Sequence, residues 1–195
     1  LKHIEAYSRL AEIIVGKMDV LKFTSRFSRS RKLSTDDTMR QLVQAMGKWL
    51  LRGPLEEREV TNYSGIATTV ASTGGNFHEA TSTIVEAMLQ SPRFIYRIEH
   101  QRGDGTSWPV NDFELASRLA RFFWSSIPDD TLLDLAESGK LSDTGTLGSQ
   151  IDRMMNDRRS SRFCDNFPGQ WLQLDRLITS IPDQKKFPYF YYNGY

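Results

Sequence analysis

Apolar side chains recur every three or four residues over most of this chain. The stripe from Ile4 to Met18 keeps this spacing, and so do the stripes over 39–50 and 113–123. Such spacing places the apolar side chains on one face of a helix. No convincing pair of strand-like segments lies between the stripes. We therefore predict an all-α fold, an irregular bundle of about eight helices in one or two packed units.

Local signals mark where several of these helices begin and end. Gly53 and Pro54 are expected to stop the helix over 39–50, and Gly139 is a natural stop further along. Asn76, with Glu79 three residues later, has the form of a capping box. The pattern therefore predicts separate helices of ordinary length rather than one long rod.

A loop over 100–110, with glycine, aspartate and proline as turn signals, divides the chain. We predict an N-terminal helix and basic linker over 1–35 and a first helical domain over 36–99. A second helical domain follows over 100–195 and is expected to be incomplete at its C-terminus. The chain starts with Leu1 rather than Met, so we expect it to be a piece or a processed product of a longer protein.

Charge is spread unevenly along the sequence. The 25 basic and 24 acidic side chains give a net charge of +1, which argues against a dedicated nucleic-acid binder, since such domains are usually strongly basic. Residues 1–60 hold 12 basic and 8 acidic side chains, a net of +4, and residues 61–195 hold 13 and 16, a net of −3. We expect the two parts to attract each other within one fold.

Much of the positive charge lies in a basic run over 22–32, which has five basic residues and no acidic one. Phe23 and Phe27 lie inside it, four residues apart. Arg26 and Arg29 are therefore candidate contacts for a phosphate or an acidic partner, with the rings stacking. The alternative, which we favour, is a solvated linker whose two rings pack onto the domain.

A second group of candidates lies around the predicted domain boundary. Arg93 and Arg97 are four apart, so on a helix they would share a face and could grip an anion or a carboxylate. They could equally pair with acids such as Glu99 or Asp129 and lock the two domains together, and we favour this structural role. Arg118 is a further candidate contact, in a segment rich in aromatic residues.

No catalytic or cofactor motif stands out. The chain has no Walker loop, GxGxxG, GxSxG or CxxCH, so it cannot attach a c-type haem covalently. Its three histidines lack a second ligand at a convincing metal spacing. The single cysteine, Cys164, is expected to be a buried and inert thiol. We predict no metal and no cofactor in this chain, and its sequence leaves catalysis undecided.

Apolar runs long enough to cross a membrane are also missing. The sequence has no stretch of about 18 consecutive apolar residues, so no membrane-spanning helix is expected.

Several long segments carry a family resemblance. They are LQSPRFIYRIE, ELASRLARFFWSSIPDDTLLDLAESGKLSD, QIDRMMNDRRSSRF, NFPGQWLQLDRL and FPYF, with MGKWLLRGPLEEREV before them. Together they resemble the planctomycete-type domains of unknown function, two consecutive helical domains of large bacterial proteins that often carry a c-type cytochrome module. The resemblance covers about residues 36–190. Gly53 and Pro168 depart from the family pattern, in which an arginine and a small residue are usual.

The resemblance implies a multi-domain bacterial protein, exported to the envelope or periplasm and linked to a redox partner, with haem elsewhere in the parent protein. It implies no reaction and no catalytic residues. Our first hypothesis is a helical module that supports electron transfer, with other domains of the parent chain and a cytochrome as partners. The alternative is a scaffold or binding module for a protein or polymeric partner, because arginine and tryptophan residues occur without a catalytic constellation.

Overall fold

A computed structural model describes residues 2–33, 37–99, 105–106 and 108–192 of the chain. Within these ranges the protein has eight helices of seven or more residues and no strand. The predicted all-α bundle of about eight helices is therefore confirmed. None of the described helices is both long and apolar enough to span a lipid bilayer.

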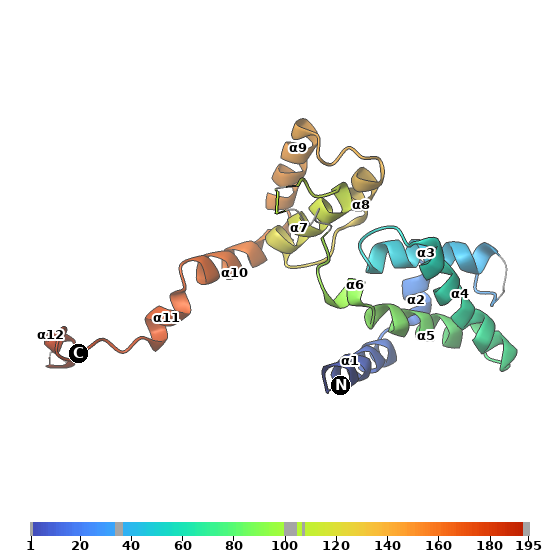
Figure 1. The fold of residues 1–195 in the computed structure, drawn as a ribbon, viewed down its shortest axis with the longest axis horizontal. Helices are drawn as coiled ribbons and strands as arrows, with labels where there is room; N and C mark the ends of the chain where they lie inside the picture. The colour runs from blue at the N-terminus through green and yellow to red at the C-terminus, as the bar shows by residue number, and fades with distance from the viewer. Residues whose placement is uncertain (1, 34–36, 100–104, 107, 193–195) are drawn as a thin grey trace.

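The first unit packs its helices around α5. It contains α1 (Lys2–Lys17), α2 (Val20–Thr24), α3 (Asp37–Leu50), α4 (Glu57–Ser72), α5 (Phe77–Leu89) and the single turn α6 (Pro92–Ile95). Figure 1 shows α1, α3 and α4 gathered around α5. Met46 of α3 and Ile84 and Met88 of α5 are fully buried in the shared core. The stripe spacing in the sequence therefore produces a core that excludes water.

The second unit has a separate core built on one tryptophan. It contains α7 (Asp112–Trp124), α8 (Asp130–Glu137), α9 (Thr144–Met155) and a 3-10 turn, η1 (Arg158–Ser160). The buried Trp124 packs with Leu132, Leu141 and Met154. Its indole Nε1 donates a hydrogen bond to the Met154 carbonyl at 3.1 Å, so the polar atom of this large side chain is satisfied inside the core.

Three helices lead away from these units. α10 (Ser161–Trp171) packs against α7, and α11 (Leu174–Thr179) and α12 (Pro188–Tyr192) continue outward from it (Figure 1). The ring of Phe163 lies 4.9 Å from that of Phe122 and 5.8 Å from that of Phe123, measured between centroids. These rings are the anchor of α10 on the second unit.

The predicted helix ends are confirmed at several places. Asn76 Oδ1 accepts a hydrogen bond from the Glu79 backbone N–H at 3.0 Å, and Glu79 Oε2 accepts one from the Asn76 backbone N–H at 3.1 Å. Gly139 has a φ of 65° just after α8, a left-handed conformation that glycine adopts without steric cost. Leu141 then folds back into the core of the second unit.

Ion pairs join the two units, as the uneven charge predicted. Arg26 Nη2 lies 2.6 Å from Asp130 Oδ2. Lys48 Nζ lies 2.6 Å from Glu137 Oε2 and 3.8 Å from Asp134 Oδ1. Both basic residues belong to the positive first part of the sequence and all three acids to the negative second part. The expected attraction between the parts is therefore confirmed at these residues.

The prediction for the cysteine was wrong. Cys164 is exposed, although it lies beside Phe163 on a helix that packs against α7. Successive residues of a helix point about 100° apart, so the side chain after a packed ring turns toward solvent. The apolar neighbours in the sequence were therefore a poor guide to its burial.

A pocket between the two helical units

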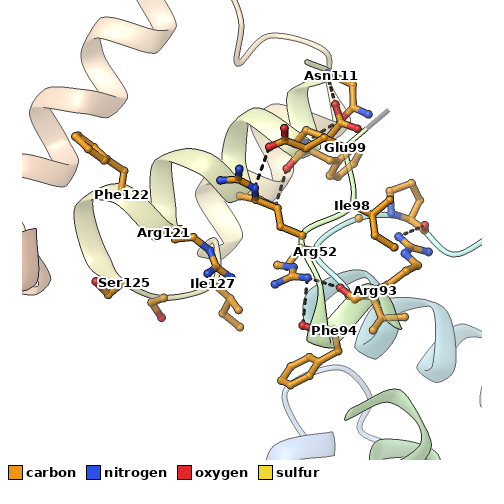
Figure 2. A pocket seen from close by; sticks show the side chains of 18 of the residues that line it. Arg52, Arg93, Phe94, Ile98, Glu99, Asn111, Arg121, Phe122, Ser125 and Ile127 are labelled. Carbon is orange, nitrogen blue, oxygen red and sulfur yellow. Dashed lines mark hydrogen bonds and ion pairs between the residues drawn. The ribbon is translucent and has the colours of Figure 1, made fainter. Parts of the chain in front are cut away.

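An open pocket of about 1140 Å³ lies between the two units. The first unit lines it with residues from the chain that follows α3 and from the segment over 93–99. The second unit contributes residues from α7 and from the turn after it, and α10, which packs against α7, completes that side. Figure 2 shows side chains of both units reaching into the same space. We therefore take this pocket as the candidate functional site.

Arg52 forms hydrogen bonds that fix the part of the first unit that lines the pocket. It follows α3 with a φ of 62°, a left-handed conformation that is uncommon for a residue with a side chain. Its Nη2 donates hydrogen bonds to the carbonyls of Arg93, Phe94 and Tyr96, the last at 3.1 Å. These carbonyls lie in and just after α6, where helix ends leave acceptors without a partner. Arg52 therefore fixes the segment that forms the neighbouring wall.

No described carboxylate forms an ion pair with Arg52. Burial lowers the pKa of its guanidinium, and the positive charges of Arg121 and Arg93 lower it further. The guanidinium still carries its charge at neutral pH, because the ordinary arginine pKa is far above 7. The pocket thus contains a positive charge that is partly removed from water.

Arg121 contributes a second positive charge from the opposite unit, on an exposed side chain. It lies on α7, lines the pocket and has no ion pair among the described residues. Figure 2 shows its side chain turned toward the pocket near Ile127. Two arginines from two units therefore face one pocket, and neither forms an ion pair with a described acid, although Glu56, Glu99 and Glu114 also line it. Guanidinium groups in this situation suit carboxylates and phosphates, which accept two parallel hydrogen bonds.

Apolar side chains from both units also line the pocket. Phe94 and Ile98 come from the first unit, and Phe122, Ile127 and Phe167 from the second. The rings of Phe122 and Phe167 meet edge to face, with centroids 5.3 Å apart. The pocket therefore combines apolar contact area with about as much polar and charged surface.

Amide and hydroxyl groups complete the second-unit wall. Asn166 and Gln170 lie four residues apart on α10, and Asn166 Nδ2 donates to Ser125 Oγ at 3.0 Å. Ser125 ends α7 with a φ of 49°. The turn after α7 therefore brings polar groups of two helices to the same rim.

Arg93 and Arg97 both line the pocket, but they do not lie on one helical face as the sequence suggested. Tyr96 is extended, with φ −104° and ψ 155°, and ends α6 after one turn. Arg97 therefore lies beyond the helix, and the expected shared helical face was wrong. Two residues four apart share a helical face only where the helix continues through all the residues between them.

Each of these two arginines has an acidic neighbour. Arg93 Nη1 lies 2.5 Å from Glu59 Oε2, and its Nη2 donates to the Pro54 carbonyl at 3.1 Å. Arg97 Nε lies 3.2 Å from Glu99 Oε1. Their role as contacts for an outside anion remains a prediction, but both charges are already matched inside the molecule.

Arg118 forms the best-defined ion pair near the site. Its Nε donates to Glu99 Oε1 at 2.8 Å and its Nη2 to Glu99 Oε2 at 2.7 Å. These hydrogen bonds lower the pKa of the Glu99 carboxyl, and the charge of Arg97 adds to the effect. Because Arg118 belongs to α7 and Glu99 follows α6, the pair ties the chain leaving the first unit to the second.

Arg26 and Arg29 lie outside the pocket. Arg26 pairs with Asp130, and its guanidinium carbon is 4.9 Å from the centre of the Trp49 ring. Phe23 also packs on Trp49, with centroids 5.7 Å apart. The rings of the basic run therefore face the domain, whereas Arg29 is exposed and has no ion pair among the described residues.

Arg52 and Arg121 are the pocket residues that sequence reasoning missed as sites. The signal for Arg52 was its place beside the Gly53–Pro54 stop, where the chain must change direction. Arg121 lies three residues after Arg118, so the two share a helical face. Neither signal shows that the two charges meet at one pocket, which requires the packing of both units.

Metal ligation has no support in the described part of the chain. No group of three or more histidine, cysteine, aspartate or glutamate side chains gathers there in a way that could hold a metal ion. The arrangement in the pocket is suited to binding an anion through hydrogen bonds and charge.

Comparisons with known protein families match two separate segments of the chain, one before and one after residues 100–109. Residues 38–99 match the family model described as PSD5, protein of unknown function (DUF1595). Residues 110–193 match the model described as PSD4, protein of unknown function (DUF1592). No curated protein and no solved structure matches the chain. Two consecutive domains of unknown function are thus found, and the pocket is lined by residues of both matched segments.

Proposed function

We propose that these two consecutive domains form a binding module that holds an acidic, partly apolar peptide segment of a partner protein in the pocket between them. The observation that carries this proposal is the pair of arginines, Arg52 and Arg121, that face one pocket from two units without a described acidic partner. Recognition of acidic segments by clustered arginines is a recurring mode of protein interaction.

The size and openness of the pocket favour a peptide over a small metabolite. Pockets for small molecules usually measure about 300–1,000 Å³ and enclose most of the ligand, whereas this one measures about 1140 Å³ and is open on one side. An extended chain can cross such a space and place successive side chains on different walls. Its carboxylates would meet the arginines, and its apolar side chains would pack on Phe94 and Phe122.

Charge complementarity should also affect how fast the complex forms. The arginines keep their charge at any physiological pH, and long-range attraction accelerates the encounter with an acidic partner. Added salt screens this attraction over a distance of about 10 Å at 0.1 M ionic strength. We therefore expect association, more than dissociation, to slow as salt is added.

Nuclear magnetic resonance of the full chain tests where the peptide binds. The probe is a ten-residue peptide of alternating Glu and Phe, and the control peptide has Gln in place of Glu. We expect the acidic peptide to shift the backbone amide signals of Gly53, Phe94 and Phe122, which all line the pocket. Shifts confined to α9 or to the exposed face of α4 would overturn the proposal.

The cytochrome association and the envelope location are implied only by the family resemblance and remain predictions. They concern the longer protein to which this chain is expected to belong. The sequence of that protein, searched for a CxxCH motif and an export signal, tests both, together with haem absorbance of the purified full-length product. Binding in the pocket does not depend on the outcome.

A further inference from the structure

Two apolar surfaces that lie far apart on the molecule are left uncovered. One lies on α1, where Ile4, Tyr7, Leu10, Ile13 and Ile14 are exposed. The other is the C-terminal arm, which we define as residues 171–192. Figure 1 shows that the arm runs away from both units and that α12 lies far from α1. The two surfaces therefore do not cover each other within one molecule.

The apolar face of α1 is wider than the contact that covers it. Ala11 and Val15 are buried where α1 packs on α5. Ile4, Leu10 and Ile14 extend the same apolar face beyond that contact, and Ile4 is 69% exposed. A helix buries an apolar stripe of roughly 100° against its own core. The remaining part of the face is therefore available to a second surface.

The C-terminal arm carries its own row of apolar side chains. Trp171 is 71% exposed, Ile181 85%, Tyr189 79% and Phe190 66%. A monomeric protein rarely leaves a contiguous apolar patch of more than a few hundred Å² in water, and larger ones mark interaction sites. The arm therefore has the composition of an interface.

The exposed area is close to what a stable pairing of two chains needs. An aromatic side chain presents roughly 150–250 Å². The arm has five exposed aromatics among its described side chains, because Phe187 and Tyr191 add to the three already named, and together they expose roughly 450–800 Å². The apolar face of α1 adds to this area. Specific interfaces bury about 800 Å² on each partner. One copy thus offers, in its two surfaces together, about the area of one side of an interface.

We propose that the chain pairs with a second copy by exchange, with the C-terminal arm of each copy packed on the exposed face of the other copy's α1. A twofold axis makes such contacts reciprocal, because each surface of one copy meets the other surface of its partner. The exchange covers both apolar surfaces in one closed dimer. The pocket between the two units is not used, so the proposal is independent of the peptide-binding function.

Analytical ultracentrifugation of the intact chain and of three variants tests the exchange. Leu10→Glu together with Ile13→Glu places charge on α1, and Tyr189→Ser together with Phe190→Ser removes the rings of the arm. Met155→Glu is the matched control, since Met155 is an exposed apolar residue on α9. All of these side chains are exposed, and circular dichroism checks that each variant keeps its helices.

The intact chain and the Met155→Glu control should change from 22.4 kDa to twice that mass as concentration rises. The α1 variant and the arm variant should each dissociate at least tenfold more readily. Their mixture should associate again, because one intact arm meets one intact α1. The proposal is overturned if the intact chain stays monomeric at all concentrations, as it would if a different protein covers the arm. It is equally overturned if the mixture of the two variants stays monomeric. It is also overturned if the arm variant dissociates but the α1 variant does not, because that result would mean that the two arms contact each other directly.

Discussion

Arg26 Nη2 lies 2.6 Å from Asp130 Oδ2 and joins the basic run of the first unit to the start of α8 in the second. The contact spans 104 residues of sequence. The ion pairs of Lys48 with Asp134 and Glu137 also join the first unit to α8. These ion pairs join the same two units whose residues line the pocket.

A double-mutant cycle on Arg26→Ala and Asp130→Ala measures this contact. Both side chains are partly exposed, so we expect a coupling energy of about 0.2–1 kcal/mol, lower at high salt. Arg26→Ala alone should cost more than the coupling energy, because Arg26 also lies over the Trp49 ring. Urea unfolding of the four proteins gives the values. Additive effects of the two substitutions at low salt would contradict the interaction.

The charge of Asp129 is expected to stabilise the second unit. Its carboxylate accepts hydrogen bonds from Arg153 Nη1 at 2.7 Å and from the Leu132 backbone N–H at 3.1 Å. Asp129→Asn keeps a side-chain acceptor for the helix start and removes the charge that faces Arg153. We expect a loss of about 1–3 kcal/mol in the free energy of unfolding. Urea unfolding followed by tryptophan fluorescence measures it.

The matched control for this substitution is Asp152→Asn, because Asp152 is exposed on α9 and has no ion pair among the described residues. Substitutions of this kind usually change stability by less than about 0.5 kcal/mol. Equal effects of the two substitutions would show that the contacts of Asp129 do not stabilise the fold.

Acid should destabilise the second unit through two aspartates. Burial alone would raise the pKa of Asp129, but hydrogen bonds from Arg153 and Leu132 and the nearby arginine charges lower it overall. Hydrogen bonds from the Arg159 side chain and backbone lower the pKa of Asp157. A lowered pKa in the folded state means that the unfolded state binds protons first as the pH falls.

The stability that these carboxylates contribute is therefore complete above the ordinary aspartate pKa of 3.8 and is lost as the pH falls below it. We expect the urea midpoint to fall as the pH is lowered from about 4 toward about 2, and to fall less in Asp157→Asn. An Asp157→Asn protein with the same acid dependence as the unmodified chain would contradict this assignment.

The left-handed backbone of Arg52 predicts an unusual order of substitutions. Arg52→Ala and Arg52→Gly both lose the hydrogen bonds to the carbonyls after α6. Only glycine adopts a φ of 62° without a clash of its Cβ atom. We expect Arg52→Gly to be more stable than Arg52→Ala by about 1 kcal/mol. Thermal unfolding compares them, and a more stable alanine variant would argue against this conformation.

Much of the fold could be predicted from local sequence. The capping box at Asn76, the end of α3 before Gly53 and the stop at Gly139 all lie where the sequence places them. Each depends on chemistry within a few residues. Helix ends of this kind need no knowledge of the tertiary structure.

The pocket depends on relationships that the sequence does not display. Arg93 and Arg97 were expected on one helical face, but the extended Tyr96 separates them. Arg121 becomes a pocket residue only because α7 packs where the chain leaving α3 can meet it. Long-range packing therefore decided which arginines face a common space, whereas local pattern decided which residues are helical.

The affinity of the acidic peptide for the unmodified chain and for Arg121→Gln tests the central claim most directly. Isothermal titration with the Glu/Phe peptide should give a dissociation constant about tenfold higher for Arg121→Gln, which corresponds to about 1.4 kcal/mol. The Gln/Phe peptide should bind both proteins equally, and Arg58→Gln, at an exposed site on α4, should leave the affinity unchanged. Equal affinity of the acidic peptide for the unmodified chain and Arg121→Gln would contradict the claim that the pocket recognises an acidic segment.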